Sequence, residues 1–272
     1  MKRLLSVFTV PLLLAGAAAA LPCRAQSDTA RGNAGGDAPP PINLDAPATL
    51  APGTTLFRLE ARAFGGEEDL VYAGLSLRYG LRGGVEAILR GAFAGRDHLA
   101  LPSGGGAIRH GGTDVELAAK YGVPGLPNVA LLIGASFPVT PAQNDVYLTL
   151  GVAATARLGA NGALYLNPRA VFVDHNTIAG IGLGARLRLA PAISLAGDYT
   201  PVVSGDNTRD ETTGARRRRD VYGVGVRYAV AKNARLEIEA GYTNATGPTT
   251  GFALTPGLGN SGAFFVSLTS RR

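Results

Sequence analysis

The sequence predicts an all-β protein, a transmembrane antiparallel up-and-down β-barrel of about twelve strands. Three patterns support this fold. Apolar residues alternate with polar or small residues in segments of about ten, the connections between segments are mostly short and long in turn, and aromatic residues stand where segments end. Because the side chains of a strand alternate between its two faces, each segment has one apolar face and one mixed face.

The first 25 residues, "MKRLLSVFTVPLLLAGAAAALPCRA", have the form of a secretory signal peptide. Two basic residues precede an apolar stretch that ends in small residues. We expect cleavage after Ala25, with Ala20 as the alternative site. Pro22 stands where a small residue normally precedes a lipidated cysteine, which disfavours lipidation of Cys23. Cleavage after Ala25 would leave a mature chain without cysteine.

Residues 26–52 are rich in Ala, Gly and Pro and hold few large apolar side chains, so they cannot form a core of their own. We expect a flexible N-terminal segment that lies in the periplasm or is tucked into the domain formed by residues 53–272. Hydrophobic residues make up 46% of the chain. No later stretch is continuously apolar over 18 or more residues, which excludes a transmembrane helix and favours apolar residues spread over many strands.

Alternation divides the remaining chain into twelve predicted strands, and an even number is what a single-chain bacterial outer-membrane barrel requires. These strands are 54–64, 70–80, 84–94, 113–121, 128–137, 146–158, 163–173, 178–189, 193–203, 220–230, 235–244 and 261–270. The sixth, within "DVYLTLGVAATARLG" (145–159), alternates without a break. Its length fits a tilted strand, which needs about 9–11 residues to cross the hydrocarbon. Because its apolar register faces lipid, we expect Val152 to face lipid and Ala153 to face the lumen.

The connections are short at one end of the barrel and mostly long at the other. "LRGG" (81–84), "GVPGLP" (122–127) and "GANG" (159–162) belong to the short set. The long set includes "GRDHLALPSGGGAIRHGG" (95–112), "SGDNTRDETTGARRRR" (204–219) and "ATGPTTGFALTPGLGN" (245–260), with "GGEED" and "DHNT" as shorter exceptions. Short periplasmic turns and longer outer loops are typical of outer-membrane barrels.

Aromatic residues stand at both ends of the predicted strands, in the register of the apolar face. Those at the short-turn end are Tyr79, Tyr121 and Tyr228, and those at the long-loop end are Phe93, Phe137, Phe172, Tyr199 and Tyr242. Two such girdles mark the two interfaces of a membrane. We therefore expect the protein in the bacterial outer membrane.

The segment "IAGIGLGARLRLAPAISLAGDY" (178–199), the later "LEIEAGYTNATGPTTGFALTPG" (236–257) and "RAFG" (62–65) resemble an uncharacterised family of outer-membrane β-barrel proteins, a domain of unknown function. The resemblance implies a fold and a location but no activity. This chain lacks the family's early histidine and ends in "VSLTSRR" rather than in an aromatic residue. A weaker resemblance is to the barrel proteins associated with meta-pathway phenol degradation, which implies passage of hydrophobic compounds.

The glycines of "GIGLGA" (180–185) allow two interpretations. A dinucleotide-binding loop would need a helix to follow, whereas "RLRLAP" continues the alternation. In the barrel, Gly180, Gly182 and Gly184 all face the lumen, as Gly223 and Gly225 do on a later strand. A wall without side chains has room for bulky lumenal groups, either tyrosines or the N-terminal segment.

No residues of the chain form a recognisable catalytic, cofactor or metal site. His98, His110 and His175 lie in the long-loop-side connections without the serine partner that a barrel hydrolase would need. They also lack the spacing of metal ligands. The sequence therefore predicts neither an enzyme nor a cofactor, and an outer-membrane enzyme is only a third alternative.

Four consecutive arginines, Arg216, Arg217, Arg218 and Arg219, stand in a long loop beside several acids. They form either a solvated loop surface or a contact for the phosphates of lipopolysaccharide, because the arginine fork suits phosphate oxygens. The isoelectric point near 9.7 comes without a nucleic-acid-binding motif, so we expect no nucleic-acid partner.

The lumen register of the strands carries most of the charges, because charges are costly on the lipid face. It holds eleven basic and seven acidic residues, including Arg62, Asp114, Asp198 and Arg235. The candidate pore-lining residues are Arg58, Glu60, Arg78, Glu86, Arg90, Glu116, Lys120, Arg157, Arg169, Arg186, Arg188, Arg227, Glu237 and Glu239. These charges either pair across the lumen and plug it or line a water-filled pore with a positive bias.

The sequence thus favours a barrel that allows passive passage of small solutes, anionic or amphiphilic ones. The alternative is a structural or surface-interaction barrel with a plugged lumen. A barrel of eight strands is filled by side chains and one of 16–18 leaves a channel, so twelve strands do not decide between the two.

Overall fold

The computed structural model describes residues 40–64, 70–94, 99–100, 107–108, 113–139, 146–172, 176–210, 213–230, 236–257 and 262–272. The predicted signal peptide and the first part of the predicted N-terminal segment lie outside these residues, as do His98, His110, His175 and Arg235. Within the described ranges, no helix has the length and apolar character to cross a membrane.

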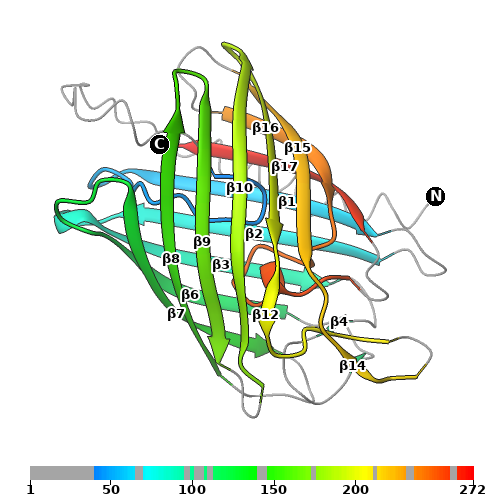
Figure 1. The fold of residues 1–272 in the computed structure, drawn as a ribbon. Coiled ribbons are helices and arrows are strands. Elements are labelled where there is room, and N and C mark those ends of the chain that lie inside the picture. The colour runs from blue at the N-terminus through cyan, green and yellow to red at the C-terminus, as the bar shows by residue number, and fades with distance from the viewer. Residues whose placement is uncertain are drawn as a thin grey trace.

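The main sheet is a closed antiparallel barrel in which strands that follow one another along the chain pair and β17 returns to β1 (Figure 1). Its strands are β1 (Thr55–Phe64), β2 (Leu70–Gly80), β3 (Val85–Ala94), β6 (Thr113–Gly122), β7 (Val129–Val139), β8 (Tyr147–Leu158), β9 (Gly162–Phe172), β10 (Ile178–Ala190), β11 (Ile193–Thr200), β12 (Val202–Ser204), β15 (Val221–Ala229), β16 (Leu236–Thr243) and β17 (Ala263–Arg271). Pro201 separates β11 from β12, and both pair with β10 as one interrupted strand. The predicted barrel of twelve strands is confirmed.

The connections contain a few small elements. Two-residue ladders join β4 (Leu99–Ala100) to β5 (Ala107–Ile108) and β13 (Thr208–Arg209) to β14 (Arg216–Arg217). The 3-10 turns are η1 (Arg82–Gly84) and η2 (Phe252–Leu254). In η1, Gly83 and Gly84 both have φ of 72°, a conformation that glycine adopts without strain and that closes the tight turn between β2 and β3.

The alternating residues of β8 point to opposite faces of the barrel wall, which accounts for the uninterrupted alternation of this segment. Leu148 and Leu150 point outward, with exposed fractions of 59% and 44%, whereas Ala153 faces the interior and is fully buried. Seven of the eight predicted girdle residues are exposed on the same outer face, among them Tyr79 and Tyr121 at the short-turn end and Phe137 at the long-loop end, and the eighth, Tyr242, is half-buried. The barrel therefore has an apolar, aromatic-rimmed outer wall that suits lipid.

A proline interrupts the ladder between β8 and β9 at membrane depth. Pro168 has no N–H to donate, and the ladder is not continuous opposite Val152. The side-chain amide of Asn167 donates instead to the Val152 carbonyl at 2.6 Å. An unsatisfied carbonyl would be costly in lipid, so this bond keeps the wall intact.

Candidate functional site

Two segments of the chain fill the interior of the barrel. The N-terminal insert (residues 40–50) precedes β1 at the short-turn end, and the loop insert (residues 244–257) connects β16 to β17 at the long-loop end. Figure 1 shows the first in blue and the second in orange within the ring of strands. Each is buried along most of its length, with Leu44 exposed by 5% and Phe252 by 0%.

Glycines in β10 make the room that these inserts occupy. A Cβ atom added to Gly182 would lie 2.5 Å from Leu44 Cδ2, and one added to Gly184 would lie 2.7 Å from Pro41 Cγ. A Cβ atom on Gly180 would lie 2.7 Å from Leu254 Cδ2, in the loop insert. The wall predicted to have room for bulky groups thus receives both inserts.

Tyrosines complete the packing around the same wall. Leu44 packs in one cluster with Ala46, Ala163 and Tyr165. Leu254 packs in another with Tyr147, Val171, Ile178 and Val202. The glycine wall and the lumenal tyrosines therefore enclose the inserts together.

The N-terminal insert is held at Asn43 by an acid of the wall. The Asn43 backbone N–H donates to Asp198 Oδ2 at 3.0 Å, and its side-chain amide donates to Asp198 Oδ1 at 2.9 Å. The same amide donates to Thr243 Oγ1 at 3.0 Å. Side chains of β11 and β16 thus fix the position of this one residue.

Cationic side chains from three strands bind backbone carbonyls of the N-terminal insert. Arg227 Nη2 donates to the Pro40 carbonyl at 2.9 Å and Arg169 Nη1 to the Asn43 carbonyl at 2.6 Å. Lys120 Nζ donates to two further carbonyls, those of residues 46 and 48, at 3.2 and 2.6 Å. Such charge-assisted hydrogen bonds are stronger than neutral ones.

The N-terminal insert also brings an acid of its own into the lumen. The Asp45 carboxylate forms an ion pair with Arg90. Burial by itself raises the pKa of Asp45, but the charges of Arg90, Arg78 and Lys120 outweigh it, so the pKa lies below its ordinary value. The carboxylate is therefore ionised across the physiological range.

The loop insert binds acids of β6 through two threonines. Thr250 donates from its backbone N–H to Glu116 Oε2 at 3.0 Å and from its hydroxyl to Glu116 Oε1 at 2.6 Å. The Thr249 hydroxyl donates to Asp114 Oδ2 at 2.5 Å. Arg169, which already binds the N-terminal insert, donates from Nη2 to the Ala253 carbonyl at 3.1 Å and so joins the two inserts.

The remaining charges of the wall pair with one another in two groups. One group links β1, β15 and β16 through the ion pairs Arg58–Glu60 at 3.0 Å, Arg58–Glu239 at 3.2 Å, Arg62–Glu60 at 2.6 Å, Arg227–Glu239 at 3.0 Å and Arg227–Glu237 at 3.8 Å. The other links β2, β3 and β6 through Arg78–Glu86, Lys120–Glu86 at 3.1 Å and Arg90–Glu116 at 3.2 Å. These pairs offset much of the cost of burying charges.

The candidate pore-lining residues fall into three sets by burial. The fully buried ones are Glu60, Glu86, Arg90, Glu116, Lys120, Arg169, Arg227 and Glu239; the partly exposed ones are Arg58, Arg78, Arg186 and Glu237; the exposed ones are Arg157 and Arg188. Arg186 and Arg188 form no ion pair with another described residue. Positive charge therefore collects near the short-turn mouth of β10.

The described residues border two small cavities between the inserts and the wall. One cavity of about 80 Å³ is bordered by Asn43, Asp45, Arg58 and Ala253, among others. A second, of about 10 Å³, lies beside Glu116. Since one water molecule takes about 30 Å³ of liquid, the larger cavity holds a few waters at most.

Sequence reasoning missed the residues through which the inserts bind. Asn43, Asp45 and Thr250 lie outside the alternating strands, so the period-two pattern carries no signal for them. The apolar residues Ile42 and Leu44 in a Pro- and Ala-rich segment, and Phe252 and Leu254 in a Thr-rich loop, are the signals that could have revealed them.

Comparison with solved structures places the fold among outer-membrane barrels. The structure is similar to the NanC porin, with a TM-score of 0.53 and 9% identity over 79% of this chain and 99% of that chain. It is similar to the COG4313 outer membrane channel from Pseudomonas putida F1, with a TM-score of 0.51 and 16% identity over 83% and 97%. A third similar structure is the KdgM porin, with a TM-score of 0.49 and 10% identity over 80% and 98%.

No family model matches the chain, and the search of curated proteins found no match. At such low identities the structural likeness concerns the fold. The closed barrel, its apolar outer wall and the likeness to the NanC porin and the Pseudomonas putida F1 channel agree with the predicted location, and the chain is an outer-membrane β-barrel.

Proposed function

We propose that this barrel is a channel for the passive passage of small solutes, with a preference for anionic ones. The pathway is the lumen, and the arrangement described above is its closed state. Withdrawal of the N-terminal insert towards the short-turn end opens it, while the loop insert stays in place and narrows the passage.

The observation that carries this proposal is the set of cations that bind the N-terminal insert. Arg227, Arg169, Arg90 and Lys120 come from four different strands and direct their N–H groups at oxygen atoms of the insert. Withdrawal would remove the Asp45 carboxylate and leave these four cations facing water. An anionic solute would offer them oxygen atoms of the same kind.

The net charge of the wall supports the same preference. Without Arg235, which is not described, the lumen register holds ten basic and seven acidic residues. A narrow passage with low-dielectric walls focuses such an excess and raises the local concentration of anions. The apolar face of Tyr165, which the N-terminal insert covers through Leu44 and Ala46, would also be available to the apolar part of an amphiphilic solute.

The names of two similar structures are consistent with passage. NanC is called a porin and the Pseudomonas putida F1 protein an outer membrane channel, and both have this fold. The alternative, a closed barrel with a structural or surface role, is favoured by the small size of the lumenal cavities that the described residues border, about 80 and 10 Å³.

Conductance in planar bilayers tests the proposal, with variants that displace the insert. Gly182→Ala combined with Gly184→Ala would place Cβ atoms 2.5 Å from Leu44 Cδ2 and 2.7 Å from Pro41 Cγ, whereas Gly151→Ala with Gly197→Ala meets neighbours no closer than 3.6 and 3.5 Å. We expect rare, anion-selective openings in the unmodified protein, many more in the first variant and no change in the second. Silence in all three proteins would favour the closed structural barrel.

A further inference from the structure

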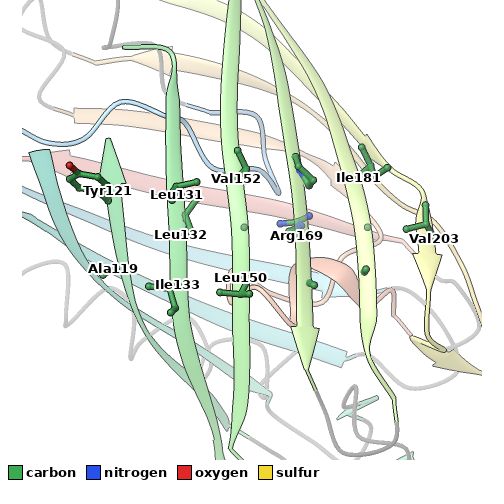
Figure 2. A pocket seen from close by; sticks show the side chains of 15 residues that line it. Ala119, Tyr121, Leu131, Leu132, Ile133, Leu150, Val152, Arg169, Ile181 and Val203 are labelled. Atoms are coloured by element: carbon green, nitrogen blue, oxygen red, sulfur yellow. The ribbon is translucent and has the colours of Figure 1, made fainter. Parts of the chain in front are cut away.

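An apolar groove of about 720 Å³ crosses the outer wall of the barrel over β6, β7, β8, β9, β10 and β12 (Figure 2). Its lining includes large exposed side chains, among them Leu131, Leu150 and Ile181. It also includes small, half-buried ones, notably Ala170 and Ala179. The groove is therefore a hollow in a surface that otherwise presents large apolar residues to lipid.

The groove runs across the strands rather than along them. The ladder places Tyr121 opposite Leu131 and Leu131 opposite Val152, and in Figure 2 Tyr121 and Val203 lie at opposite ends. Five strand spacings of about 4.8 Å give a length of about 24 Å. This exceeds half the hydrocarbon thickness, about 15 Å, which is the depth that an acyl chain reaches.

The ends of the groove differ in height because the strands tilt by about 35–45° from the barrel axis. Tyr121 is at the short-turn end of β6 and Val203 at the long-loop end of β12. Since short turns are periplasmic in such barrels, the end at Val203 lies at the outer leaflet.

The run of four arginines (residues 216–219) contacts the barrel at this outer end of the groove through Arg218. Arg218 donates from Nη1 to the Val203 carbonyl at 3.1 Å and from Nε to the Gly205 carbonyl at 3.0 Å. The pair of short strands β13 and β14, called here the arginine hairpin, is anchored by the buried Asn207. The Asn207 side-chain amide donates to the Arg219 and Leu254 carbonyls at 2.7 Å each. Residues 216–219 are all exposed. A fixed, exposed cationic loop thus adjoins the open end of an acyl-sized groove.

We propose that this surface binds the lipid portion of lipopolysaccharide, a phosphorylated and acylated glycolipid of the outer leaflet. One acyl chain lies in the groove over Ala170 and Ala179. A phosphate lies against the arginine hairpin, whose guanidinium groups match phosphate oxygens. The groove selects the acyl chain and the arginines select the phosphate, so neither part alone accounts for the binding.

Native mass spectrometry of the full mature chain with added lipid A tests this site. Two variants address the two parts: Arg216→Gln with Arg219→Gln, and Ala170→Leu with Ala179→Leu to fill the groove. The matched controls are Arg82→Gln with Arg272→Gln, two exposed arginines at the short-turn end, and Ala87→Leu with Ala240→Leu, two exposed alanines outside the groove.

We expect one lipid A to remain bound to the unmodified protein. The arginine variant should weaken binding about tenfold or more, as the loss of a charge-assisted contact predicts. The groove variant should weaken binding to a similar extent, because the leucine side chains occupy the space of the acyl chain, and each control should bind as before. Dephosphorylated lipid A should bind the unmodified protein about tenfold more weakly. Equal losses in variants and controls, or equal binding of dephosphorylated lipid A, would overturn the proposal.

Discussion

The two inserts fill the same lumen but are attached to the barrel in different ways. The loop insert is tied to strands at both ends and is folded on itself: Thr246 N–H bonds to the Phe252 and Thr255 carbonyls, and Gly257 N–H bonds to the Asn244 carbonyl. Among the described residues, the N-terminal insert is joined to a strand at one end, where it leads into β1, and its hydrogen bonds run mostly to side chains of the wall. This difference in attachment is why the proposed opening withdraws the N-terminal insert and leaves the loop insert in place.

The residues that bury each insert reinforce this difference. The loop insert places Phe252 in a cluster with Phe64, Tyr72 and Ala263 of the wall, where it is fully buried. The N-terminal insert presents carbonyls to cations, and its apolar contacts come from Pro41, Ile42, Leu44 and Ala46, which are smaller than Phe252. Apolar burial is independent of solutes, whereas carbonyl–cation contacts can be exchanged for contacts with water or an anion.

The largest expected effect is a difference in the free energy of unfolding between a variant of the loop insert and a variant of the N-terminal insert. Phe252→Ala should lower the free energy of unfolding by about 3–5 kcal/mol, because it leaves a cavity in a packed cluster. Ile42→Ala, at a residue 5% exposed, should cost under about 1 kcal/mol, because the proposal lets its insert withdraw while the strands of the barrel stay paired. Urea titration in lipid vesicles measures both. Equal costs would mean that the N-terminal insert is as integral as the loop.

The next effect concerns Arg169, which binds both inserts. Arg169→Gln should remove two charge-assisted bonds, worth about 1.5–3 kcal/mol each, and should raise the fraction of time that the pore is open at least tenfold. Arg188→Gln, an exposed arginine of the same register, serves as the control for fewer positive charges. Single-channel recording compares the two. The same open fraction in both variants would contradict the role of Arg169 in closure.

A smaller effect is the pH dependence of closure through Asp45. Because its pKa is lowered in the docked state, its ion pair with Arg90 contributes above the ordinary pKa of about 4 and is lost as the pH falls through the docked value. Conductance should therefore stay low from pH 8 to 5 and rise below about pH 4. Asp45→Asn should open more at pH 7 and respond less to acid. If Asp45→Asn keeps the wild-type response of conductance to acid, that response comes from other titratable groups.

The smallest effect concerns selectivity rather than closure. Arg186→Gln with Arg188→Gln should reduce the preference for anions without abolishing conductance, since these arginines lie at the mouth and bind no insert carbonyl in the described structure. The preference should also fade as salt rises from 0.1 M to 1 M and the Debye length falls from about 10 to 3 Å. Reversal potentials across a salt gradient measure it. A cation preference in the unmodified protein would contradict the positive bias.

The barrel wall could be predicted closely from the sequence because alternation is a local signal. The strand predicted at 178–189 is Ile178–Ala190, and that at 146–158 is Tyr147–Leu158. The strand predicted at 193–203 is interrupted at Pro201, which the alternation passes over. The inward fold of residues 244–257 was not predicted, since a Thr- and Gly-rich segment between strands reads as an outer loop.

The candidate site could be predicted only in part. The glycines of β10 indicated room in the wall, and the charges indicated a polar lumen. The partners of those charges are carbonyls and side chains up to 187 residues away, as between Arg227 and the Pro40 carbonyl, and such contacts leave no periodic trace in the sequence.

A reversible cross-link between the N-terminal insert and the wall tests the central claim most directly. Pro41 Cβ lies 3.3 Å from the Cβ position of Gly184, close to the 3.5–4.5 Å of a disulfide, so Pro41→Cys with Gly184→Cys should lock the insert in place. The mature chain predicted by cleavage after Ala25 has no other cysteine. Pro41→Cys alone is the control, because a Cβ atom at Gly184 beside the native Pro41 would itself crowd the insert. In planar bilayers the oxidised protein should be silent, and addition of a reductant should restore anion-selective openings. Equal conductance before and after reduction would contradict the claim that this insert closes the pore.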